Sequence, residues 1–148
     1  NGRTRVMEFV PFREGGEFRV AHLTLKAVAV THIVPTVGLV ISDGARTLGF
    51  SSDTSSTEEF WRVVNREPRL DALLVEASFP NSLKKLADVS GHLTPEALGA
   101  ELRKLTHEDV DILAMHLKPS FRRQLVEELA ALGVPRLVAM EPGREYEW

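Results

Sequence analysis

Four polar residues stand at the ends of apolar stretches, and their side chains are of the kinds that bind metal ions: His32, Asp53, Glu76 and His116. Imidazole nitrogens and carboxylate oxygens suit zinc and manganese, and a carboxylate can bridge two ions. Two ions roughly 3.5–4 Å apart can clamp a phosphate and lower the pKa of a bridging water. These residues therefore point to a dinuclear site with phosphodiester chemistry.

A second pair, His92 and Glu76, is suited to proton transfer. A histidine that is oriented by a glutamate can donate a proton to a leaving oxygen, and such general acid catalysis typically contributes about 10²–10⁴-fold. His92 lies in the segment Ser-Gly-His-Leu-Thr, away from the apolar stretches. We expect this pair to be the catalytic acid of the site.

Each of these five residues also has an ordinary structural interpretation. His32 and His116 could be hydrogen-bonded at strand ends, Asp53 could cap the following helix, and His92 could cap or pack at a helix start. Glu76 is harder to explain in this way, because a carboxylate that follows an apolar run is costly to bury unless it is paired. The five together favour a site over five separate structural roles.

The first third of the chain predicts β-structure. Residues 18–28 alternate between apolar and polar side chains, as a half-buried strand does. Residues 37–41 and 46–50 flank a Ser-Asp-Gly-Ala segment, and Asp-Gly between apolar runs is typical of a hairpin turn.

After Asp53 the pattern changes to alternating helices and strands. A helix is expected to begin within residues 54–57, and another to open at Thr94 with proline at its first position. The remaining expected elements are strands over 70–77, 110–115 and 136–140 and a helix over 121–132. This order predicts an α/β fold, in which loops after the strand ends gather side chains into a site.

Composition excludes several classes of protein. With a formal net charge of −3 and a pI near 6.0, the chain has no basic stripe, so a long nucleic acid is not the expected partner. It contains no cysteine, which removes thiolate zinc sites and disulfides. No apolar run approaches the roughly 20 residues that cross a bilayer, so no membrane association and a cytoplasmic location are expected.

Five segments, in order, resemble motifs of the class II 3′,5′-cyclic-nucleotide phosphodiesterases, which belong to the metallo-β-lactamase superfamily. The resemblance covers most of the chain, from about residue 28 onward. The segments are Thr-His-Ile-Val-Pro-Thr-Val-Gly (31–38), Phe-Ser-Ser-Asp-Thr (50–54), Val-Glu-Ala-Ser-Phe-Pro-Asn (75–81), Ser-Gly-His-Leu-Thr (90–94) and Met-His-Leu-Lys-Pro (115–119).

The resemblance implies a metallo-β-lactamase-like αββα sandwich assembled from two similar halves. The superfamily's upstream His-x-His-x-Asp-His motif, which supplies the remaining metal ligands, is absent from these 148 residues. Residues 1–148 are therefore expected to form a single domain that corresponds to the C-terminal half. An N-terminal half or a second copy of the chain would be the partner that completes it.

The resemblance also implies a role for each residue of the site. His32 would complete the first metal's ligand shell, Asp53 would bridge two divalent ions, zinc or manganese, and His116 would complete the second shell. Glu76 and His92 match the pair that forms a proton-donating dyad in the related ribonuclease Z.

The implied substrate is a small cyclic nucleotide such as cAMP, hydrolysed to the 5′-monophosphate, with Lys118 as the phosphate contact. Two other interpretations stay open. The chain could belong to another hydrolase of the same fold, acting on RNA 3′ ends or on another ester, or it could be a non-catalytic remnant that serves as an interaction module.

Overall fold

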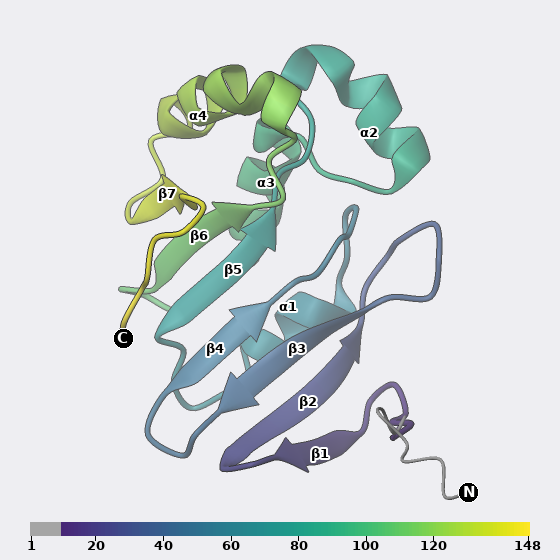
Figure 1. Ribbon diagram of the computed structural model, residues 1–148, viewed down its shortest axis with the longest axis vertical. Coiled ribbons are helices and arrows are strands. Elements are labelled where there is room, and N and C mark those ends of the chain that lie inside the picture. The colour runs from purple at the N-terminus through teal and green to yellow at the C-terminus, as the bar shows by residue number, and fades with distance from the viewer. Residues whose placement is uncertain (1–9) are drawn as a thin grey trace, which may run out of the picture.

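The computed structural model describes residues 10–148, which form one mixed sheet with strands in sequence order (Figure 1). The strands are β1 (Glu17–Val20), β2 (Leu23–Ala29), β3 (Val37–Ser42), β4 (Thr47–Phe50), β5 (Ala72–Glu76), β6 (Asp111–Met115) and β7 (Leu137–Ala139). Neighbours from β1 to β4 are antiparallel, and neighbours from β4 to β7 are parallel. The change from hairpins to helical crossovers follows the change of sequence pattern after β4.

Four α-helices accompany the sheet in this part of the chain: α1 (Glu59–Val64), α2 (Lys84–Ser90), α3 (Pro95–Leu102) and α4 (Arg122–Ala131). Short 3₁₀ turns precede α2 and α4. Thr94 caps α3 as predicted, because its side chain accepts a hydrogen bond from the Ala97 amide at 3.3 Å. No helix within residues 10–148 is long and apolar enough to span a membrane.

The predicted hairpin joins β3 and β4. Oδ1 of Asp43 accepts hydrogen bonds from the amides of Ala45 (2.8 Å) and Arg46 (2.7 Å), and Gly44 has a φ of 94°. An aspartate that binds its own turn and a glycine with positive φ are what this connection requires.

Three details differ from the sequence-based expectations. The alternating stretch over 18–28 is divided between β1 and β2 by a turn at Ala21, whose φ is 53°. Helix α1 begins at Glu59, after the Ser/Thr-rich stretch, because the side chains of Thr54, Ser55 and Ser56 bind other parts of the chain instead of capping the helix. Helix α2 was not predicted at all.

The strand directions explain why the predicted residues meet. Strand β2 is antiparallel to β3, and β3 is antiparallel to β4, so β2 runs in the same direction as the parallel strands β4 to β7. The carboxyl ends of these strands lie along one edge of the sheet. Loops that leave this edge therefore bring together residues that are far apart in sequence.

The two faces of the sheet differ. On one face the core packs against the helices: a Cβ added to Gly38 would lie 2.9 Å from Phe60 of α1, and one added to Gly49 would lie 3.6 Å from Phe60 and 3.6 Å from Val64 of the same helix. Because strand side chains alternate, neighbouring apolar residues of β3, β4 and β5 point to the other face, which we call the open face. Its residues include Leu39, Ile41, Leu48, Phe50 and Leu74, all half-buried. In Figure 1 this face is turned toward the viewer, and α1 lies behind the sheet.

Candidate metal centre

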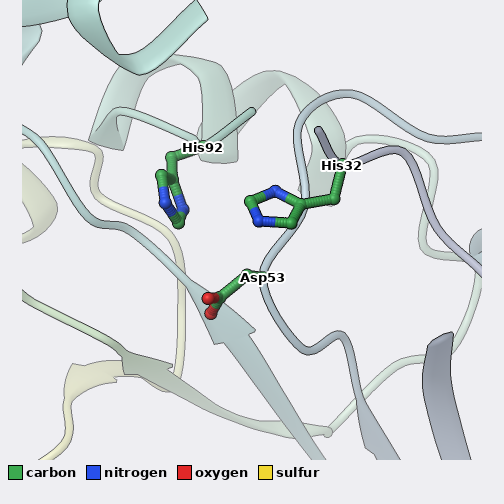
Figure 2. A group of neighbouring side chains, drawn as sticks. All are labelled: His32, Asp53 and His92. Atoms are coloured by element: carbon green, nitrogen blue, oxygen red, sulfur yellow. The ribbon is translucent and has the colours of Figure 1, made fainter. Parts of the chain in front are cut away.

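The five residues predicted to do chemistry lie together at the carboxyl-end edge of the sheet. His32 follows β2, Asp53 follows β4, Glu76 ends β5, and His116 comes directly after β6. His92 reaches the same place from the turn between α2 and α3. Figure 2 shows the side chains of His32, Asp53 and His92 directed toward a common space.

The donor atoms are close enough to share a metal ion. His32, Asp53 and His92 each offer a donor atom within 4.8 Å of the others, and Glu76, His92 and His116 form a second such group. The ring of His92 lies between the other two, with centroids 5.0 Å from His32 and 5.2 Å from His116. His92 therefore belongs to both groups, whereas the sequence suggested only a proton-donating role for it.

The tautomer of His32 favours metal binding. Its Nδ1 lies 2.8 Å from the carbonyl oxygen of Gly91, and a carbonyl can only accept, so Nδ1 carries the proton. The lone pair on Nε2 is then free to bind a metal, and a hydrogen bond of this kind orients many metal-binding histidines. Gly91 has a φ of 73°, and a Cβ there would lie 2.8 Å from Nδ1 of His32, so only glycine allows this close approach.

Glu76 is fully buried, and each of its carboxylate oxygens accepts two hydrogen bonds. Oε1 accepts from Nδ1 of His92 (2.7 Å) and from the Thr54 amide (3.1 Å). Oε2 accepts from Oγ of Ser78 (2.9 Å) and from the Leu93 amide (3.2 Å). These donors offset the cost of burying the carboxylate, and they fix the His92 ring so that its Nε2 is free.

Asp53 and His116 contact each other. Nδ1 of His116 lies 2.9 Å from Oδ1 of Asp53, and the aspartate side chain is 41% exposed. Asp53 does not cap α1, whose N-cap position is Glu58. Nε2 of His116 lies 3.4 Å from Nζ of Lys118, so the predicted phosphate contact also borders the site.

Backbone strain accompanies this arrangement. His116 has a φ of 59° and Ser52, directly before Asp53, has a φ of 54°. Positive φ costs a residue with a side chain roughly 1 kcal/mol or more, and such conformations cluster at functional sites. Two of the three predicted metal ligands are thus held by strained backbone at the ends of β4 and β6.

Ser78 is a site residue that the sequence analysis did not single out. Besides binding Glu76, its Oγ lies 2.9 Å from Nδ1 of His116 and 3.3 Å from Nδ1 of His92. The sequence did contain a signal: residues 76 and 78 are two apart at the end of a strand, so their side chains point to the same side. Ser78 therefore links the dyad to the last histidine.

The chemistry of the donor set fits a divalent metal of the zinc or manganese type. The donors are imidazole nitrogens and carboxylate oxygens, with no thiol, and the hydrogen bonds of His32 and His92 occupy Nδ1 of each, so that Nε2 is the nitrogen left for a metal or for proton transfer. His32, Asp53 and His116 could hold the ions, with His92 available as a further ligand or as an acid.

Comparisons with known proteins concern the family and the fold. A family model described as a β-lactamase superfamily domain matches residues 2–140. No curated protein sequence matches the chain.

Solved structures share the fold at low sequence identity. The metallo-β-lactamase fold protein YhfI from Bacillus subtilis matches with a TM-score of 0.73 and 17% identity, covering 89% of this chain and 52% of its own. Zn²⁺-bound PqqB from Methylobacterium extorquens matches with a TM-score of 0.69 and 18% identity, covering 93% and 55%. The short form of human tRNase Z matches with a TM-score of 0.61 and 16% identity, covering 84% and 42%.

These matches confirm the predicted metallo-β-lactamase-like α/β fold. The chain spans about half the length of the solved structures that it matches. At these identities the structural likeness concerns the fold, and activity has to be argued from the residues of the site.

Proposed function

Because the chain belongs to the metallo-β-lactamase superfamily, we propose that it contributes the metal-binding and proton-donating residues of a metal-dependent phosphodiesterase that hydrolyses 3′,5′-cyclic nucleotides. The observation that carries the proposal is the meeting of His32, Asp53, His92 and His116 around a common space, with buried Glu76 beneath His92. Two imidazole–carboxylate pairs, His92 with Glu76 and His116 with Asp53, lie side by side here. Packing at the ends of strands does not require such a cluster.

In this proposal His32, Asp53 and His116 bind two divalent ions. Bound ions of this kind lower the pKa of a water molecule and stabilise charge on a phosphate. His32 offers the lone pair of Nε2, because Nδ1 is held by the Gly91 carbonyl. Asp53 would be the bridging carboxylate, and its partly exposed side chain next to His116 supports this assignment.

The Glu76–His92 pair holds and delivers the proton. The carboxylate of Glu76 accepts from Nδ1 of His92 and stabilises the positively charged ring. The ring's Nε2 can then donate to the oxygen that leaves phosphorus. Glu76 has to stay in one position to orient His92. Its side chain is fully buried and accepts four hydrogen bonds, which fix that position.

Lys118 is proposed to contact the phosphate. Its ammonium group lies 3.4 Å from Nε2 of His116 and 5.6 Å from the centroid of the Phe79 ring. A cation on the rim of the site is suited to a phosphate oxygen. The aromatic ring beneath it keeps the ammonium near the site.

The cyclic-nucleotide substrate is supported by the five motif segments and by their order. One rival within the same fold is an enzyme that acts on RNA 3′ ends, which the likeness to human tRNase Z favours. The net charge of −3 argues against it, because a long RNA binds best to a positively charged surface.

The test is metal-dependent hydrolysis by the protein at its full natural length. We expect cAMP hydrolysis with zinc or manganese, and loss of that activity in Asp53→Ala. Asp88→Ala is the matched control, because Asp88 is an exposed aspartate on α2 whose partner is Lys84. A precursor tRNA with a 3′ trailer is the competing substrate.

Each outcome decides something. Cleavage of the tRNA but not of cAMP would replace the substrate class and keep the metal centre. Metal binding without hydrolysis of cAMP or of the tRNA would refute the proposed phosphodiesterase activity. Absence of metal binding in the full-length protein would leave the non-catalytic interaction module as the better explanation.

A further inference from the structure

A buried glutamate on α3, Glu101, binds the loop that carries Asp53. Glu101 is only 3% exposed. Burial alone would raise the pKa of its carboxyl, but the hydrogen bonds that its oxygens accept outweigh this effect and hold the pKa below the ordinary value. The donors are Nζ of Lys104 (2.8 Å), Oγ of Ser56 (2.7 Å), Nε1 of Trp61 (2.7 Å) and the amide of Thr57 (3.2 Å). The carboxylate therefore stays ionised and accepts four hydrogen bonds at neutral pH.

The loop between β4 and α1 depends on such external contacts. Residues 51–58 have no strand or helix of their own, and Asp53 lies near their start. The Thr54 amide donates to Glu76, and the Ser55 amide donates to the carbonyl of Thr31 at 2.7 Å. The Ser51 amide donates to the carbonyl of Leu74 at 2.9 Å, and Asp53 contacts His116. At residues 56 and 57 the loop is held by Glu101 and Lys104.

Lys104 completes the contact from the same helix end. Its Nζ donates to the carbonyl oxygen of Thr57 at 2.9 Å as well as to Glu101. Glu101 thus accepts hydrogen bonds from an amide and a hydroxyl of the loop, and Lys104 donates one to a carbonyl of the loop. Together they satisfy backbone groups that would otherwise be buried without partners.

We propose that Glu101, paired with Lys104, is a positioning residue for the metal centre: it fixes the loop over residues 54–57 and thereby the place of the Asp53 carboxylate. The inference rests on the proposed function to the extent that Asp53 binds metal. Glu101 does not touch the ligands, so its effect passes through the loop backbone.

The experiment compares Glu101→Gln with Glu58→Gln in the full chain. Glu58 also pairs with Lys104, at 2.7 Å, but its side chain is 85% exposed and binds no loop amide. Both variants remove one negative charge next to the same lysine. Glu58 is the exposed last residue of the loop, so only Glu101→Gln weakens the buried contacts to Ser56 and Thr57. Zinc affinity is measured by competition with a chromophoric chelator, and circular dichroism verifies that each variant is folded.

We expect Glu101→Gln to bind zinc about tenfold more weakly, at the low end of the roughly 10–100-fold seen when groups behind a metal ligand are changed. Glu58→Gln should stay within about twofold of the wild type. An equal loss in both variants would assign the effect to the charge near Lys104 and overturn the proposal.

A metal-free measurement separates this proposal from the proposed function. Amide hydrogen exchange at Thr54 and Ser55, which do not contact Glu101, should be faster in Glu101→Gln than in the wild type. If Glu101→Gln does not fold, Ser56→Ala removes one loop contact and should shift exchange and zinc affinity in the same direction by a smaller amount.

Two results then have different meanings. A wild type that binds no zinc but shows the expected change in exchange would refute the metal centre and keep the positioning role. Unchanged exchange and unchanged affinity in folded Glu101→Gln would refute the positioning role alone.

Discussion

Replacing Glu76 with glutamine is the sharpest single perturbation of the site, because the two side chains have nearly the same shape. Each oxygen of Glu76 accepts one backbone amide hydrogen, Oε1 from Thr54 and Oε2 from Leu93. A glutamine has one oxygen and one NH₂ group. Whichever way the amide is turned, one backbone N–H must face another donor.

The cost can be worked from these contacts. One buried N–H without an acceptor costs about 1–3 kcal/mol, and losing the charge-assisted bonds adds to this. The imidazole of His92 and the hydroxyl of Ser78 can each donate or accept, so they can reorient and limit the further loss of hydrogen bonds. We therefore expect Glu76→Gln to lower the free energy of unfolding by about 2–4 kcal/mol.

The assay is urea-induced unfolding followed by circular dichroism, with nitrogen NMR of the imidazole to report the tautomer of His92. The control is Glu128→Gln, because Glu128 accepts from the Asn81 amide at 2.8 Å and is only half-buried. The control should change stability by less than about 1.5 kcal/mol. If Glu76→Gln is as stable as the wild type to within about 0.5 kcal/mol and keeps the same tautomer, the described hydrogen bonds are wrong.

Three further predictions concern other parts of the chain. Gly91→Ala should destabilise the protein by at least about 1 kcal/mol in a thermal melt and weaken zinc binding, because its φ is 73° and the new Cβ would displace His32. Asp71→Asn should lower the free energy of unfolding by about 1–2 kcal/mol at pH 7. The pKa of Asp71 is lowered to about 2 although burial opposes the shift, and the magnitude is reduced because the arginines that pair with Asp71 are exposed. A carboxyl whose folded pKa is depressed stabilises the protein above its unfolded pKa near 3.9. The difference between Asp71→Asn and the wild type should therefore shrink in unfolding curves as the pH falls through this value and vanish only below the folded pKa of about 2. Thr94→Ala should lower stability by about 1 kcal/mol through loss of the α3 cap, and Thr94→Ser, which keeps the hydroxyl, should recover most of it in the same unfolding assay.

Much of the fold could be predicted from the sequence because its local signals agree with its tertiary structure. The β3–β4 hairpin is encoded by Asp43 and Gly44, and the start of α3 is encoded by Thr94 and Pro95. The meeting of His32, Asp53, Glu76 and His116 followed from their positions after strands that run in one direction. These inferences needed only periodicity, turn chemistry and the position of polar residues after apolar strands; the common direction of the strands came from the structure.

Helix α2 could not be predicted because its apolar pattern does not mark a buried face. Leu86 is 45% exposed and Val89 is 74% exposed, while Ala87 is the buried residue of the helix. A pattern of apolar residues is informative only where the fold buries them.

The contacts around Glu101 were missed for a different reason. A glutamate followed three residues later by a lysine on a helix is ordinarily a solvated pair. Nothing nearby in the sequence reveals that both side chains turn toward a loop more than 40 residues earlier. Such long-range hydrogen bonds depend on how α3 packs, which local patterns do not determine.

If a second layer covered the open face of the sheet, assembly and metal binding would be coupled. The candidate ligands lie on the rim of this face, at the ends of the same strands whose apolar side chains cover it. A second layer that covers the face and also touches the metal would bind more tightly when the metal is present. Because such coupling is reciprocal, the second layer would raise the affinity for the metal by the same factor. The metal would then bind tightly only to the assembled pair of layers.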